Sequence, residues 1–169
     1  MKDERLTNVF SIKDKNIVLT GSSGFLGQQY ANVLSSLGAN VILVDIDSIK
    51  NKKLEKNLRK KFNTNPKAIK CDITNEDSVK EMKKEILRNY KSIDILINNA
   101  VFHPKTKNKN ISIGLNSFSL EIWNNAISVD LTGTFLCSRE IGSIMEKQKK
   151  GVIVNISSIY GLVGADQRI

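Results

Sequence analysis

Short apolar runs alternate along this chain with longer segments whose apolar residues recur at helical spacing. The runs are almost continuously apolar, as is typical of strands buried on both faces of a sheet. They fall at residues 16–20, 41–44, 68–71, 93–97 and 152–156. The segments between them predict helices at residues 24–37, at 49–62, after residue 74 and at 120–147.

Polar and special residues mark where the predicted helices begin and end. Gly38 follows the first helix in the position of a C-terminal cap. Ser48 and Thr74 are the predicted N-terminal caps of the second and third helices, and Pro66 breaks the chain between them. Gly151 ends the longest helical segment. The polar stretch 101–119 is predicted to be a long loop over the carboxyl edge of the sheet.

Alternation of buried strands with helices predicts a parallel sheet covered on both faces. Right-handed crossovers then give the strand order 3-2-1-4-5, which is an α/β, doubly wound, Rossmann-type fold. The chain has 169 residues, of which 40% are hydrophobic. We therefore expect a single domain over residues 1–169.

The stretch Thr20–Gly27 reads Thr-Gly-Ser-Ser-Gly-Phe-Leu-Gly and lies where the first strand turns into the first helix. Gly21 allows the tight turn, Gly24 lets the backbone approach phosphates, and Gly27 lets the helix pack closely on the strand. Backbone N–H groups and the helix dipole at such a junction point toward an anion. The stretch predicts a dinucleotide-binding loop, and a merely flexible turn is the alternative.

Several polar residues follow the other apolar runs directly. Because the carboxyl ends of parallel strands meet at one edge of a sheet, these residues should lie beside the glycine loop. They are Asp45, Asp72, Asn98 and Asn99.

The net charge of +9 raises the possibility of a nucleic-acid partner. The lysines, however, are scattered, with clusters at 50–61 and 105–109, and aromatic residues do not alternate with them. A lysine-rich solvated surface is the better interpretation, so we expect no nucleic-acid partner. His103 is the only histidine and has no metal-ligating neighbours at suitable spacing, so no metal site is predicted.

Cys71 and Cys137 are far apart and each lies in an apolar segment. They are expected to be buried free thiols in a reducing compartment. No apolar run approaches the length of about 20 residues that a membrane helix needs, and no secretory signal is recognisable. These features favour a cytoplasmic protein without a membrane partner.

Taken together, these motifs resemble the short-chain dehydrogenase/reductase family from Phe10 onward. The resemblance rests on 20–27, Asp45, 71–74, 98–100 and 152–161. The segments 157–161 and 166–169 look more like a bacterial branch often described as flagellin-modification or surface-sugar oxidoreductases.

The resemblance implies hydride transfer between a nicotinamide cofactor and a small molecule with a hydroxyl or carbonyl group, possibly a sugar. It makes Ser158 the residue that hydrogen-bonds the substrate oxygen, and it places Asp130 where the family has an asparagine that supports a water relay. The implied cofactor-binding residues are Gly21, Ser22, Ser23, Gly24, Phe25, Leu26, Gly27, Asp45, Asp72, Ile73, Asn98, Asn99 and Ala100.

NAD is the expected cofactor, with NADP the less favoured choice. Asp45 ends the second strand, where a carboxylate accepts from ribose hydroxyls and repels a 2′-phosphate. Lys50 and Lys52 argue the other way, because they begin the next helix and could reach a phosphate.

The sequence also departs from the family pattern. The second glycine of the loop comes one residue earlier than in the commoner motif, Val101 replaces a glycine, and Asp130 replaces the asparagine. The family's acid/base tyrosine has a lysine four residues later, and Tyr30, Tyr90 and Tyr160 are all without one.

We therefore expect a fragment that carries the cofactor-binding portion and lacks the later strands of the fold. The full-length form is expected to be a homo-oligomer. A complete, non-catalytic dinucleotide-binding or regulatory protein is the alternative.

Overall fold

The structure is a computed structural model of the chain, and it describes residues 10–103 and 118–164. Its centre is a five-stranded sheet in which all the neighbouring strands run parallel. The strands are β1 (Asn16–Thr20), β2 (Asn40–Asp45), β3 (Lys67–Lys70), β4 (Ile95–Asn98) and β5 (Val152–Asn155). They follow the order β3-β2-β1-β4-β5, which confirms the predicted 3-2-1-4-5 topology.

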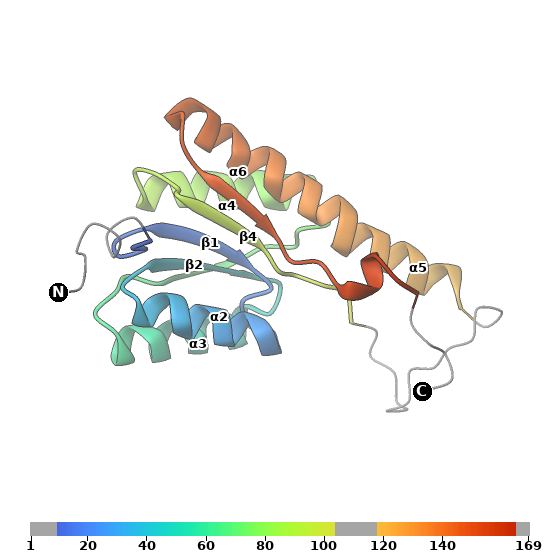
Figure 1. Cartoon of the computed structure of the whole chain (residues 1–169), viewed down its shortest axis with the longest axis horizontal. Coiled ribbons are helices and arrows are strands. Elements are labelled where there is room, and N and C mark those ends of the chain that lie inside the picture. Colours follow the sequence, from blue (N-terminus) through green and yellow to red (C-terminus); the bar gives the residue numbers. More distant parts are fainter. Residues whose placement is uncertain (1–9, 104–117, 165–169) are drawn as a thin grey trace.

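Helices cover both faces of this sheet (Figure 1). Helices α2 (Phe25–Ser36) and α3 (Ser48–Lys61) lie on one face. Helices α4 (Glu76–Asn89) and α6 (Thr134–Gln148) lie on the other. Helix α5 (Leu120–Ala126) continues through a π-helical segment (Ile127–Gly133) into α6, so that the three form one long rod. A short 3₁₀ turn (Ile159–Gly161) follows β5.

The core is divided into two apolar layers by the sheet. The larger lies under α4 and α6 and includes Val18, Ile42 and Leu96, and the smaller lies under α2 and α3 and includes Leu19 and Leu43. Adjacent residues of one strand thus enter opposite layers, as the side-chain alternation of a strand requires. This explains why β1, β2 and β4 in the middle of the sheet carry apolar residues at successive positions and not only at every second one.

Helix α2 does not bury the apolar face that its sequence suggests. Its buried residues are Gly27, Ala31 and Ser35, which follow one another at four-residue spacing. Val33 and Leu37 are more than half exposed instead. Small residues face the sheet because the helix approaches it closely, while Tyr30 and Leu34 pack, partly buried, against the smaller apolar layer.

The N-terminal caps differ from the predicted ones by one residue. Asp47, and not Ser48, accepts a hydrogen bond from the backbone N–H of Lys50 at the start of α3. Asn75, and not Thr74, accepts from Ser78 at the start of α4. In each case two neighbouring residues are good caps, and the sequence does not show which one has the extended backbone of a cap.

Other boundaries agree more closely. Gly38 follows α2 with a left-handed φ of 86°, as expected of a residue at this position. Helix α6 ends with Lys149 in the left-handed conformation, two residues before the predicted terminator Gly151. Of the predicted loop 101–119, residues 104–117 lie outside the described part of the chain.

Both cysteines are buried and free, as predicted. Burial raises the pKa of the Cys71 thiol and raises that of Cys137 to about 12. Neither thiol is therefore ionised at neutral pH.

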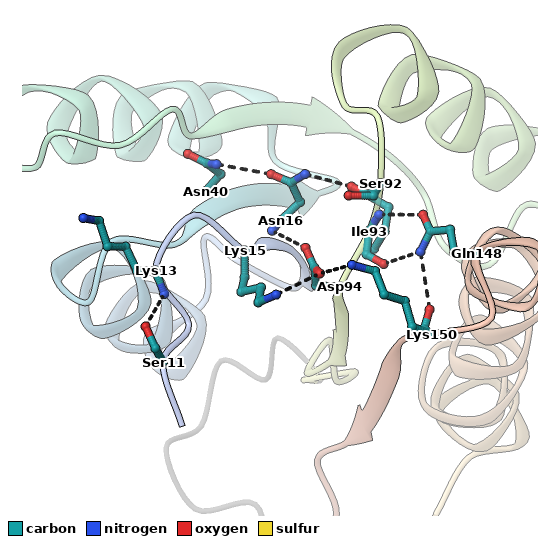
Figure 2. Close-up of polar contacts among 10 residues, drawn as sticks. All are labelled: Ser11, Lys13, Lys15, Asn16, Asn40, Ser92, Ile93, Asp94, Gln148 and Lys150. Atoms are coloured by element: carbon teal, nitrogen blue, oxygen red, sulfur yellow. Dashed lines mark hydrogen bonds and ion pairs between the residues drawn. The ribbon is translucent and has the colours of Figure 1, made fainter. Parts of the chain in front are cut away.

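A polar network joins the strands at their amino ends (Figure 2). The Asp94 carboxylate accepts from the backbone N–H of Asn16 at 3.0 Å and lies 3.5 Å from the ammonium groups of both Lys15 and Lys150. Beside it, the Gln148 side chain accepts from the N–H of Ile93 and donates to the carbonyl of that residue. Asp94 thus fixes the entry to β1 against the entries to β4 and β5.

We predict that Asp94→Asn lowers the free energy of unfolding by about 1–2 kcal/mol at neutral pH. Burial alone would raise the pKa of Asp94, but the Asn16 N–H and the two lysines outweigh burial and lower it. The carboxylate therefore stabilises the fold above its unfolded pKa of about 3.9, and this contribution is lost as the pH falls through the folded pKa.

Urea unfolding of both proteins between pH 7 and pH 3 measures this effect. The difference between them should be constant down to about pH 5 and then shrink. Glu81→Gln, which breaks an exposed ion pair with Lys84, is the control and should leave the free energy of unfolding nearly unchanged. A difference that stays constant to pH 3 would contradict the assignment.

Candidate cofactor groove

A groove of about 1230 Å³ opens at the carboxyl edge of the sheet. Its walls come from the glycine loop, the ends of β2 and β4, the turn after β3, the π-helical segment and the turn after β5. Nearly all the predicted site residues line it, namely Gly21, Ser23, Gly24, Phe25, Leu26, Gly27, Asp45, Asp72, Ile73, Asn98, Asn99, Ala100, Asp130 and Ser158. The fold therefore brings together residues that are up to 137 positions apart in sequence (158 − 21).

The glycine loop is held in a shape that side chains would not allow. Gly21 has a φ of 64°, and a Cβ there would lie 2.7 Å from the Cα of Ala100. A Cβ on Gly27 would lie 2.1 Å from the carbonyl oxygen of Gly21. Helix α2 consequently begins in direct contact with the turn that precedes it.

The first turn of α2 leaves its backbone donors available to the groove. Its N-cap is Gly24, which has no side chain to accept from them, whereas α3, α4 and α5 each begin with a side-chain cap. The first turn, Phe25–Gly27, lines the groove. Unpaired N–H groups and the positive end of the helix dipole make such a turn a site for an anion.

The Asp45 carboxylate joins the glycine loop to the end of β2. One of its oxygens accepts from the N–H of Ser23 at 2.8 Å, and the other accepts from the N–H of Asp47 at 2.9 Å. Each oxygen keeps a lone pair with which it can accept from a hydroxyl. Asp45 therefore both shapes the loop and presents a negative acceptor to the groove.

Ser22 is the one predicted cofactor-binding residue that does not line the groove. It is fully buried, and its hydroxyl lies 2.7 Å from Oδ1 of Asn51 on α3. Sequence reasoning missed Asn51, because an asparagine in a lysine-rich helix looks like a surface residue.

The residues after β4 tie that strand to β1. The Thr20 hydroxyl accepts from the backbone N–H groups of Asn99 and Ala100, and the Asn99 side chain donates to the carbonyl of Thr20. The Asn98 side chain is buried and donates to Asn155 and Ser138. The side-chain amides predicted to bind cofactor thus hold the groove wall in place.

The turn after β3 is similarly braced. The Asp72 carboxylate accepts from the N–H and the hydroxyl of Thr74. Ile73 is buried, and a Cβ on Gly133 would lie 2.6 Å from its side chain, so the π-helical segment packs directly on this turn.

Asp130 belongs to this π-helical segment and lines the groove opposite the loop. One oxygen of its carboxylate accepts from the backbone N–H of Phe102 at 2.7 Å. A π-helical turn inside a longer helix is uncommon and is frequent at functional sites. Here it points Asp130 toward the segment that leaves β4.

Ser158 lies in the groove at the start of the 3₁₀ turn after β5. Its hydroxyl oxygen accepts from the N–H of Tyr160 at 3.2 Å, which leaves the hydroxyl proton available to a ligand. Tyr90 does not line the groove. Its hydroxyl donates to the carbonyl of Asn65, and burial raises its pKa to about 12.

Comparison with known proteins identifies the class to which this fold and groove belong. The family model described as short chain dehydrogenase matches residues 15–169. The chain belongs to the short-chain dehydrogenase/reductase family of oxidoreductases.

Individual relatives support the same family. The chain is 28% identical to the NADP-dependent mannitol dehydrogenase of Alternaria alternata, over 92% of this chain and 57% of that protein. It is 31% identical to a 3-oxoacyl-[acyl-carrier-protein] reductase of Aquifex aeolicus, over 90% of this chain and 59% of that protein. The chain thus spans somewhat under two thirds of the length of these relatives.

Solved structures show the same fold. An NAD⁺-bound xylitol dehydrogenase superposes with a TM-score of 0.83 at 24% identity, over 92% of this chain and 57% of that one. A metagenomic short-chain oxidoreductase in complex with NADP superposes with a TM-score of 0.81 at 27% identity, over 93% of this chain and 68% of that one.

The groove itself fits a dinucleotide. Its uncapped helix start suits a pyrophosphate, and Asp45 suits a ribose.

Across residues 10–103 and 118–164, no helix combines the length and the apolar character needed to cross a bilayer.

We predict opposite effects for alanine at two helical glycines. Gly27→Ala should lower the free energy of unfolding by more than about 2 kcal/mol, because its Cβ has no room beside the Gly21 carbonyl. Gly142→Ala on α6 should raise it by about 0.5–1 kcal/mol, because its Cβ would make an ordinary contact 3.6 Å from Ile153 and alanine favours the helix.

Urea unfolding of the two variants tests both signs. A Gly27→Ala protein as stable as the wild type would show that α2 does not need its close contact with the loop.

Proposed function

We propose that this protein binds NAD in the groove. We propose also that it forms part of an oxidoreductase that transfers hydride to or from a small hydroxyl or carbonyl compound. The observation that carries the proposal is the pairing of an uncapped helix start at Phe25–Gly27 with the Asp45 carboxylate on the same groove. In this assignment the glycine loop and the first turn of α2 hold the pyrophosphate, and Asp45 accepts from the ribose. Asp72 and Ile73 flank the adenine, and Asn99 and Ala100 border the second ribose.

The environment of Asp45 favours NAD over NADP. A 2′-phosphate would have to lie beside this carboxylate and would be repelled by it. Lys50 also lines the groove, but its ammonium pairs with Asp47 at 3.0 Å. The Lys50 N–H and ammonium lower the pKa of Asp47, so this neighbour is a carboxylate too. Among the relatives described above, one is NADP-dependent, one was solved with NADP and one with NAD⁺, so the preference rests on this chain's own residues.

We predict that the protein binds NAD more tightly than NADP. Asp45→Asn should shift the ratio of the two dissociation constants toward NADP by about tenfold, because the charge is removed. Affinity for NAD itself should also fall, since one carboxylate oxygen becomes an NH₂ group that faces a backbone donor.

Calorimetric titration of both cofactors measures the ratio. Asp77→Asn is the matched control, because it removes the same charge from an exposed position at the start of α4. Tighter binding of NADP by the wild-type protein would overturn the NAD assignment.

For the chemical step, we propose that the Ser158 hydroxyl donates a hydrogen bond to the substrate oxygen and that Asp130 occupies the relay position. The bound nicotinamide would supply or accept the hydride. A serine orients a carbonyl but does not provide a proton at neutral pH, and an ionised Asp130 accepts hydrogen bonds without donating them. No tyrosine of the sequence is followed by a lysine four residues later.

We therefore predict that the 169-residue chain binds NAD and does not turn over. Appending a family-type segment with Tyr-x-x-x-Lys should restore activity, since general acid/base catalysis contributes about 10²–10⁴-fold. Asp130→Asn should raise that activity further, because asparagine keeps the acceptor for the Phe102 N–H and adds a donor.

NADH formation with simple alcohols and sugar alcohols is the assay. Ser158→Ala in the extended protein is its control. Ser158-dependent NADH formation by the chain alone would refute the prediction. It would show that another residue of the chain does the acid/base work.

We further propose that the protein acts in the cytoplasm as a homo-oligomer. Among the described residues, several large apolar side chains are more than half exposed. They include Leu120, Trp123 and Leu131 on the long rod and Val152 on β5. Exposed apolar stretches of this kind mark interfaces. Sedimentation over a range of concentrations tests this, and a strictly monomeric protein would contradict it.

The narrower branch assignment, and with it a sugar or sugar-derived substrate, rests on the tail segments 157–161 and 166–169. Of these, residues 165–169 lie outside the described part of the chain. The relatives above support the family as a whole and not that branch. A non-catalytic dinucleotide-binding protein shares the groove and is not favoured by the family match.

A further inference from the structure

The side chains of Ser22 and Asn51 are both fully buried, so neither can touch a ligand in the groove. We propose that Asn51 is a positioning residue for the glycine loop and that it acts through the hydroxyl of Ser22. The inference rests on the proposed function, because it concerns the loop assigned to the pyrophosphate.

The surrounding groups fix the orientation of the Asn51 amide. Its nitrogen lies 2.8 Å from the carbonyl oxygen of Leu43 and 3.4 Å from that of Ile69. Two carbonyls require a donor, so this atom is the NH₂ group and Oδ1 faces Ser22. The Ser22 hydroxyl donates to Oδ1 at 2.7 Å, and the Val44 carbonyl oxygen is a second, longer acceptor for it at 3.2 Å.

One side chain therefore links three parts of the site. Leu43 and Ile69 lie near the carboxyl ends of β2 and β3, and Ser22 is the centre of the glycine turn. The backbone N–H of Ser22 also donates to the carbonyl of Val44 at 3.3 Å. The turn is thus attached to β2 from beneath, while the Asp45 carboxylate holds the next N–H of the turn from the groove side.

This attachment sets the spacing between two ligand-binding groups. The start of α2 follows the turn directly and takes the phosphates in the proposed function, whereas Asp45 at the end of β2 takes the ribose. Burying two polar side chains costs free energy unless each has a hydrogen-bond partner. The hydrogen bond between Ser22 and Asn51 is directional. Unlike apolar packing, it holds the turn at one distance and in one direction from β2.

The experiment compares ADP-ribose with adenosine, which lacks the phosphates, in calorimetric titrations of the full chain. Ser22→Ala should weaken ADP-ribose binding by about tenfold and change adenosine binding by less than about twofold. Asn51→Leu should reproduce most of this loss, because it leaves the Ser22 hydroxyl only its longer bond to Val44. The double variant should lose no more than Ser22→Ala alone, because the link runs through the Ser22 hydroxyl.

Ser35→Ala is the matched control. Ser35 is also buried, on α2, and within the described residues its hydroxyl has no hydrogen-bond partner. Its removal should change neither affinity. Unchanged ADP-ribose affinity in a folded Ser22→Ala protein would overturn the inference. An equal loss of both ligands, together with a lower melting temperature, would also overturn it, since that is the result of a purely structural role.

Hydrogen exchange in the ligand-free protein separates this inference from the proposed function. Failure of the wild-type protein to bind either ligand would refute the proposed function alone. In that case the amides of residues 22–27 should still exchange faster in Ser22→Ala than in Ser35→Ala. Equal exchange rates there would overturn the positioning role by themselves.

Discussion

The direct contact between helix α2 and the glycine turn is the constraint on which the site depends. There is no space for a Cβ on Gly27, since the Gly21 carbonyl oxygen lies where that Cβ would be. This contact puts the uncapped start of the helix at the carboxyl edge of β1, between the ends of β2 and β4. The proposed anion site therefore depends on packing as much as on hydrogen-bonding groups.

Around this contact, polar side chains mostly serve the backbone. The Thr20 hydroxyl and the Asn99 amide tie β1 to β4, and the Asp45 carboxylate ties the turn to β2. Each of these groups binds backbone atoms that would otherwise be left unpaired beside the groove. The ligand is thus expected to meet mainly backbone N–H groups, with Asp45 and Ser158 as the exposed side-chain contacts at opposite ends. Such a wall is rigid before a ligand arrives, which reduces the entropy cost of binding.

The sequence predicts the sheet order and the groove well, because both follow from strong signals. Continuous apolar runs and the glycine spacing leave few alternatives once crossovers are right-handed. The inner face of α2 could not be predicted, because close packing selects Ala31 and Ser35 over the larger apolar residues nearby. Asn51 could not be predicted either, since its value depends on two strand carbonyls and a serine that are distant in sequence. Spacing within one segment carries no information about such contacts.

In the proposed function, the carboxyl edge of the sheet binds NAD through the start of α2. An amide NMR titration of the labelled protein with NAD tests it most directly, because every backbone N–H reports separately. Binding of NAD at this edge should give the largest shifts at residues 22–27, with smaller ones near Asp45 and after β4. The polar network around Asp94 at the opposite edge serves as an internal reference and should not respond. Shifts centred on that edge, or none at residues 22–27 at saturating NAD, would show that NAD does not bind at the start of α2.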